Sequence, residues 1–154
     1  MAKKRRKPKM EFRYYQMSAG SPILALLGQK WVQNYGNGVD YLHFHNYLEI
    51  GYCYGGDGHM ILGEEEERFY GGIVTVIPPN YPHTTNSDIG TVSKWEYLVI
   101  DVEGFMKKFL DNPVKAEKVI QRIYSRVLFF EEKEHLSISK KIHKILDIMR
   151  DGEE

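Results

Sequence analysis

The feature that most constrains this chain is a set of polar residues inside a run of β-forming residues. His43, His45 and Glu49 all occupy odd positions of the segment Tyr41–Tyr54. Successive side chains of a strand alternate between the two faces of a sheet, so these three groups are expected to point to the same side. Imidazole and carboxylate groups that face a protein interior are costly unless a partner satisfies them. The pattern therefore predicts a strand whose inner face carries a polar site.

A fourth group of the same chemistry, His83, directly follows the proline-rich segment Pro78–Pro82. Three imidazoles and one carboxylate form a donor set for a divalent transition metal such as zinc, nickel, manganese or iron. The same groups can instead act as hydrogen-bond partners of an organic ligand. The sequence leaves both interpretations open for His43, His45, Glu49 and His83.

Short β-forming runs separated by turn residues continue to about Val102. Gly55–Gly58 and Gly63–Glu65 each indicate a hairpin, and Ile73–Ile77 and Ser93–Val102 are typical of further strands. Several short strands with turn residues every ~8–12 positions predict a sandwich or a small barrel. We therefore expect an all-β core over residues 11–102.

After Val102 the apolar residues repeat with helical spacing. Phe105–Leu110 and Val114–Tyr124 are predicted as short helices, and Ser137–Arg150 gives the clearest pattern. In that last segment one predicted face carries Ile138, Ile142, Ile145 and Met149. The pattern predicts a helical appendage over residues 103–154, which serves as core cover or as a dimer contact.

Charge is distributed unevenly along the chain. Residues 1–10 carry six basic groups and no acidic one, and we expect them to form a disordered tail. The rest holds 15 basic and 21 acidic groups, a net charge of −6, which disfavours nucleic-acid binding by the body of the protein. The sequence shows no signal peptide and no apolar run of membrane-spanning length, and Cys53 is the single cysteine. These features predict a cytoplasmic protein with no membrane partner.

Two sequence motifs resemble those of the cupin superfamily. The run His43-x-His45-x3-Glu49-x6-Gly56 resembles the first cupin motif, and Gly72-x5-Pro78-x-Asn80-x2-His83 resembles the second. Asn80 stands where the family usually has glycine, and asparagine also tolerates a left-handed turn position. The wider pattern, in segments 48–52, 56–59, 72–83 and 95–101, is similar to the effector-binding domain of AraC-type transcription regulators.

This resemblance implies a double-stranded β-helix (a cupin or jelly-roll barrel) followed by C-terminal α-helices. It also implies a domain that senses a small effector, a sugar or related metabolite, and that forms a homodimer. DNA contact would come only through a helix-turn-helix domain, which these 154 residues do not include. The residues expected to bind the ligand are His43, His45, Glu49, His83, Trp95 and Tyr97.

A metal-dependent cupin enzyme, an isomerase or an oxygenase, is the alternative. The predicted His and Glu set would then leave coordination positions open for substrate. Tyr52, Tyr97 or Glu96 would have to supply acid–base chemistry, and no clear pair stands out. We therefore favour the sensor, assign no catalytic residue, and expect Trp31 to belong to the core.

Overall fold

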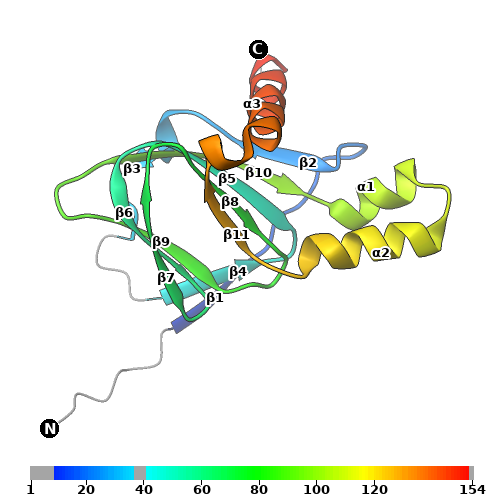
Figure 1. The fold of residues 1–154 in the computed structure, drawn as a ribbon, viewed down its shortest axis with the longest axis horizontal. Helices are drawn as coiled ribbons and strands as arrows, with labels where there is room; N and C mark the ends of the chain where they lie inside the picture. Colours follow the sequence, from blue (N-terminus) through cyan, green and yellow to red (C-terminus); the bar gives the residue numbers. More distant parts are fainter. Residues whose placement is uncertain (1–8, 37–40, 153–154) are drawn as a thin grey trace, which may run out of the picture.

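The computed structural model describes residues 9–36 and 41–152, which form two β-sheets that face each other with three α-helices on the outside (Figure 1). The first sheet has the strand order β1-β4-β9-β6-β7, and the second has the order β11-β8-β5-β10-β2, with β3 paired to β10. The strands of the first sheet are β1 Lys9–Arg13, β4 Tyr41–His45, β9 His83–Ser87, β6 Asp57–Leu62 and β7 Glu65–Tyr70. The strands of the second sheet are β11 Leu128–Glu131, β8 Ile73–Ile77, β5 Leu48–Gly55, β10 Ser93–Ile100, β2 Ile23–Leu26 and β3 Val32–Gln33.

The predicted cupin-like architecture with C-terminal helices is confirmed. No strand pairing joins the two sheets within the described residues, so they form an open sandwich rather than a closed barrel. Residues 1–8 of the predicted basic tail lie outside the described part of the chain, and β1 already begins at Lys9.

The long strand predicted over Tyr41–Tyr54 is two strands in opposite sheets. Asn46 and Tyr47 interrupt it, so that β4 joins the first sheet and β5 joins the second. An interruption of two residues preserves the alternation of side chains, and His45 and Glu49 therefore both face the space between the sheets. The predicted shared direction holds, although the reason is a bend between two layers rather than one continuous strand.

The hairpin predicted at Gly55–Gly58 is wrong, because β5 and β6 belong to different sheets. The glycines instead carry the chain from one sheet to the other. Gly56 has φ 92°, and a Cβ added to it would lie 2.5 Å from the Cα of Ser93, so this crossover requires glycine. The second predicted hairpin, around Gly63, is confirmed as the turn between β6 and β7.

The helices are α1 Val102–Phe109, α2 Pro113–Tyr124 and α3 Leu136–Asp151, close to the three predicted segments. The region 103–154 also contains β11, which pairs with β8 and so belongs to the second sheet. Its residues Leu128-Phe129-Phe130 are consecutive apolar residues without helical spacing, which suits a strand covering a sheet edge. No helix in the described residues is long and apolar enough to cross a membrane.

Helix α3 lies on the outer face of the second sheet (Figure 1). Ile142 and Leu146 are buried there in one cluster with Tyr52 and Leu98. Of the predicted apolar stripe, Ile142, Ile145 and Met149 pack in or against this cluster, whereas Ile138 is 51% exposed and the buried residue that the stripe omitted is Leu146.

An ion pair between the half-exposed Arg150 and the buried Glu96 fixes the C-terminal end of α3. Arg150 Nη1 and Nη2 lie 3.0 and 2.8 Å from the two carboxylate oxygens of Glu96 on β10. The Tyr54 hydroxyl donates to the same carboxylate at 2.8 Å. Burial alone would raise the pKa of Glu96, but Arg150 and Tyr54 outweigh it and hold that pKa below its usual value.

We predict that Arg150→Ala lowers the free energy of unfolding by about 1–2 kcal/mol at pH 7, because it leaves a buried carboxylate without its cation. The Glu96 pKa is lowered in the folded state, so this contribution is present above the unfolded pKa of about 4.3 and is lost as the pH falls below it. Urea unfolding of both proteins at pH 7 and at pH 3, well below the unfolded pKa, measures the difference. Lys144→Ala, an exposed basic position on α3, is the matched control and should cost less than about 0.5 kcal/mol.

Candidate functional site

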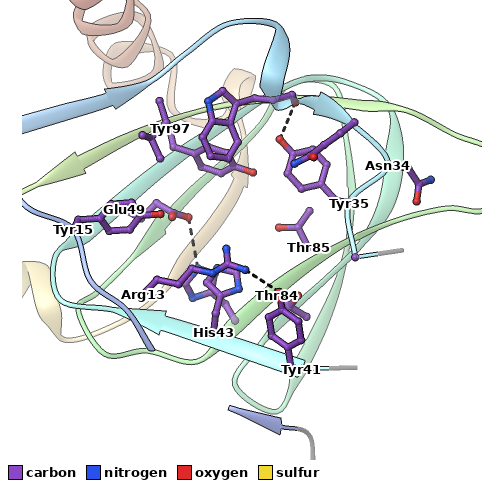
Figure 2. Close-up of a pocket in the computed structure, with 15 residues that line it drawn as sticks. Arg13, Tyr15, Asn34, Tyr35, Tyr41, His43, Glu49, Thr84, Thr85 and Tyr97 are labelled. Carbon is purple, nitrogen blue, oxygen red and sulfur yellow. Dashed lines mark hydrogen bonds and ion pairs between the residues drawn. The ribbon is translucent and has the colours of Figure 1, made fainter. Parts of the chain in front are cut away.

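A cavity of about 220 Å³ lies between the two sheets. Glu49 on β5 and Tyr97 on β10 line it from the second sheet, and His43 and His83 line it from the first (Figure 2). Much of the remaining lining consists of hydroxyl groups, contributed by Tyr15, Tyr35, Tyr41, Thr84 and Thr85.

Three of the predicted site residues meet at one wall of this cavity, where Glu49 and His83 line it and His45 is buried behind them. One side-chain donor atom from each of His45, Glu49 and His83 lies within 4.8 Å of the others, and all three residues are buried. The Glu49 carboxylate is 3.1 Å from Nε2 of His45 and 3.6 Å from Nε2 of His83. One carboxylate thus faces two imidazoles that come from the opposite sheet.

Backbone carbonyls fix the tautomer of both imidazoles. Nδ1 of His45 lies 2.8 Å from the carbonyl oxygen of Tyr47, and Nδ1 of His83 lies 2.8 Å from that of Tyr81. A carbonyl oxygen only accepts, so each Nδ1 carries the hydrogen. Each Nε2 then points toward Glu49 without a well-directed hydrogen bond. A neutral Nε2 presents a lone pair, so a proton or a metal ion has to lie between it and the carboxylate.

The turn before His83 is held against the same wall. Asn80 has φ 61°, the left-handed conformation expected from the motif, and its backbone N–H donates to the His45 carbonyl at 2.7 Å. The Pro78–Pro82 segment is thereby tied to the end of β4, and this contact sets the position of His83 relative to His45.

The pKa values of neighbouring groups at this wall shift in different directions. Burial disfavours the charged imidazole of His45, but the carboxylate of Glu49 outweighs it and raises the pKa of His45 above its usual value. Burial would likewise raise the pKa of Glu49, and the two imidazoles lower it instead. For His43, burial together with the charges of His83 and Arg13 lowers the pKa to about 3, so this imidazole is neutral at pH 7.

His43, predicted as a fourth ligand, lies beside this group rather than in it. It pairs with His83 across β4 and β9, and the two rings meet edge-on with centroids 4.2 Å apart. None of its nitrogens belongs to the group of mutually close donor atoms. Its Nδ1 is buried without a hydrogen-bond partner.

Of the predicted aromatic pair, Tyr97 lines the cavity and Trp95 does not. The two rings are stacked with centroids 5.9 Å apart, and Trp95 is fully buried behind Tyr97. Trp31, expected in the core, also lines the cavity and meets Tyr97 edge-on at 5.4 Å. Tyr52 and Glu96, two of the candidate acid–base residues, lie on the outer face of the second sheet instead.

The N-terminal strand supplies cavity residues that the sequence did not identify. Arg13 and Tyr15 line the cavity, while the alternate residues Phe12 and Tyr14 are 51% and 70% exposed. Asn46 holds this arm, because its side chain accepts from the backbone N–H of Tyr15 and donates to the carbonyl of Tyr15, both at 2.9 Å. No local pattern in the sequence identifies β4 as the partner of this strand.

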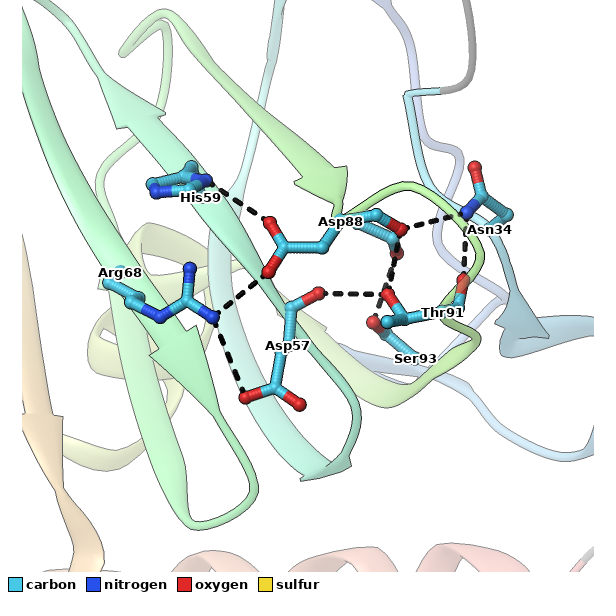
Figure 3. Close-up of polar contacts among 8 residues, drawn as sticks. Asn34, Asp57, His59, Arg68, Asp88, Thr91 and Ser93 are labelled. Carbon is cyan, nitrogen blue, oxygen red and sulfur yellow. Dashed lines mark hydrogen bonds and ion pairs between the residues drawn. The ribbon is translucent and has the colours of Figure 1, made fainter.

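A surface network holds the opposite rim of the cavity (Figure 3). Asn34 Nδ2 donates to the Thr91 carbonyl at 2.7 Å, which ties the segment after β3 to the loop after β9. In that loop Asp88 lies 2.9 Å from Arg68 and 3.4 Å from His59, on the β6–β7 hairpin. These contacts therefore connect the rim to the β6–β7 hairpin of the first sheet.

Comparison with known families assigns the fold. Residues 34–154 match the AraC-like ligand binding domain, and this segment includes most of the cavity wall. The chain belongs to this family. No curated protein matches the AraC-like domain described here.

Several solved structures are similar to this AraC-like domain. A cupin 2 conserved barrel domain protein from Rhodopseudomonas palustris is 18% identical, with a TM-score of 0.39 over 56% of this chain and 68% of that one. ToxT from Vibrio cholerae is 10% identical, with a TM-score of 0.47 over 82% of this chain and 48% of that one. A ToxT structure with bound unsaturated fatty acid gives 13% identity and a TM-score of 0.41, over 68% of this chain and 39% of that one. The chain thus spans about half the length of ToxT or less.

We predict that Asn46→Ala loosens the arm, because the backbone of Tyr15 loses both of its side-chain hydrogen bonds. Two hydrogen bonds contribute about 1–3 kcal/mol, so the Tyr15 amide should exchange with solvent about 10- to 100-fold faster. Amide exchange by NMR measures this directly. The amides of the β5–β10 pairing are the internal control and should stay protected; unchanged exchange at Tyr15 would show that Asn46 does not hold the arm.

Proposed function

We propose that this AraC-like domain binds a compact, hydroxylated metabolite, a sugar or a close relative, on behalf of a transcription regulator. The observation that carries the proposal is the cavity between the sheets, lined by hydroxyl, amide and imidazole groups and closed on one side by the N-terminal arm. Such groups both donate and accept hydrogen bonds, which suits a ligand with several hydroxyls.

The size and the aromatic walls support the same class of ligand. A cavity of about 220 Å³ is below the ~300–1,000 Å³ typical of pockets for drug-sized molecules, and it suits a molecule on the scale of one sugar ring. Trp31 and Tyr97 present aromatic rings on which the C–H face of a sugar can pack.

The proposed route for the signal is short. Strands β5 and β10 carry Glu49 and Tyr97 on the cavity side, and Tyr52 and Glu96 on the side of α3. One layer of strands therefore separates the ligand from the helix. A ligand that binds two arrangements of this layer with different affinity would shift the position of α3 or of the arm.

In this proposal the shift acts on a part of the regulator outside this domain. We propose that it reaches DNA through a helix-turn-helix domain of the full regulator, and that two copies act together as a homodimer. Both follow from the family rather than from contacts in the described residues.

Ligand binding is tested by thermal unfolding with a panel of monosaccharides, sugar alcohols and sugar acids, and with palmitoleate as an unsaturated fatty acid. A true ligand at ~100 times its Kd should stabilise the fold by about 2.7 kcal/mol, or about 5–10 °C in Tm. Thr84→Phe places a ring in the cavity and should abolish the shift, whereas Ile89→Phe, at a fully exposed turn position, should keep it. A shift with palmitoleate alone, or one that survives Thr84→Phe, would contradict the proposal.

We also propose that His45, Glu49 and His83 hold one divalent transition metal. The support is the donor set itself: two Nε2 atoms of fixed tautomer face one buried carboxylate, and neither Nε2 has a hydrogen bond. Carbonyl partners on Nδ1 are the usual second contacts of metal-binding histidines. A bound metal would supply a cationic centre for oxygen atoms of the ligand.

Elemental analysis of protein purified without added metal tests this part. We expect about one zinc, nickel, manganese or iron per chain, and nearly none in His83→Ala or Glu49→Gln. His59→Ala, at an exposed histidine outside the cavity, is the control and should retain the metal. Metal-free wild-type protein would contradict the metal site and leave the sensor proposal standing. Stoichiometric metal together with turnover of a small substrate would favour the enzyme instead.

A further inference from the structure

We infer that the effector is an acid: a hydroxylated carboxylate such as a sugar acid, whose carboxylate binds Arg13. The inference rests on the proposed function, since it names the charge of the ligand in the same cavity. It begins from the one arginine among the residues that line this cavity.

Arg13 has binding capacity that its neighbours leave unused. Its Nη2 lies 3.2 Å from the Tyr41 hydroxyl, and its Nε lies 3.4 Å from the Glu11 carboxylate. Glu11 is two residues away on the same strand with its side chain 48% exposed, and exposed pairs of this kind contribute little. A guanidinium has five N–H donors in a planar fork that matches a carboxylate.

The cavity contains no other counter-ion for this cation among the residues described. Glu49 is the one acidic residue in the lining, and its two oxygens lie against the imidazoles of His45 and His83. It forms no ion pair with Arg13. A cation is therefore placed at a ligand cavity whose own carboxylate is already engaged.

His43 gives a second, independent observation. Its side chain points into the cavity beside Arg13 (Figure 2), and its buried Nδ1 has no hydrogen-bond partner. A ligand carboxylate between Arg13 and His43 would accept from the guanidinium fork and satisfy that nitrogen. The remaining lining, with hydroxyls from Tyr35, Thr84 and Thr85, would bind the neutral part of the ligand.

One arginine matches one negative charge, so we assign a carboxylate rather than a phosphate. Isothermal titration calorimetry of the 154-residue chain compares D-galacturonate with D-galactose, and D-glucuronate with D-glucose; D-glucose 6-phosphate tests the phosphate. At least one acid should bind about 10- to 100-fold more tightly than its neutral partner, the range for a charge-assisted hydrogen bond.

Arg13→Gln should remove this preference, because it should weaken binding of the acid about 10- to 100-fold more than binding of the neutral sugar. Arg13→Lys keeps the charge without the fork and should fall between the two. Arg126→Gln, the same change at an exposed arginine outside the cavity, should have no effect. The Tm of each variant confirms that it is folded.

The outcomes separate this inference from the proposed function. Equal binding of acid and neutral sugar, or acid binding undiminished in Arg13→Gln, would overturn the carboxylate and leave the sugar sensor intact. Preference for D-glucose 6-phosphate over both acids would overturn the carboxylate in the same way. If no member of either pair binds, both the inference and the sugar-like ligand are wrong.

Discussion

The rest of the structure depends on one buried carboxylate that is shared by two imidazoles across the sheets. Glu49 comes from β5, whereas His45 and His83 come from β4 and β9 of the opposite sheet. A carboxylate removed from water is stable only with partners at short range, so the two sheets have to meet at this point. The carbonyls of Tyr47 and Tyr81 orient the imidazoles, and both belong to the connections that lead into or out of these strands.

This constraint leaves space beside the three residues. The cavity lies beside the edge of the first sheet that β4 and β1 form. Arg13 and Tyr15 line it on that side. The same two strands that form its far wall, β5 and β10, carry α3 on their other face through Ile142, Leu146 and the Arg150–Glu96 pair. The arm and the helix thus both contact the walls of the site.

Local patterns in the sequence predict much of this, and partners distant in the chain account for what they miss. Alternation predicts the common direction of His45 and Glu49, and helical spacing predicts α1, α2 and α3. Alternation within a segment does not specify which strand pairs with which, so in the sequence alone the crossover at Gly56 resembles a hairpin turn. For the same reason Arg13 was not connected to the cavity.

Local patterns also do not predict which of two side chains on the same face reaches the cavity. Trp95 and Tyr97 share a face, yet one lies behind the other, and only Tyr97 reaches the cavity. Trp31 reaches it because the segment before β3 folds across β10. His43 has the type and parity of a ligand, but direct pairing with His83 places it beside the group instead.

We propose that one layer of strands, β5 and β10, connects the cavity to α3. Hydrogen–deuterium exchange of the chain, with and without the compound that raises Tm most, tests it directly. We expect slower exchange in β1, β5 and β10 together with a changed rate in α3, which packs on the outer face of the second sheet. Protection confined to the cavity strands, with α3 unchanged, would contradict it.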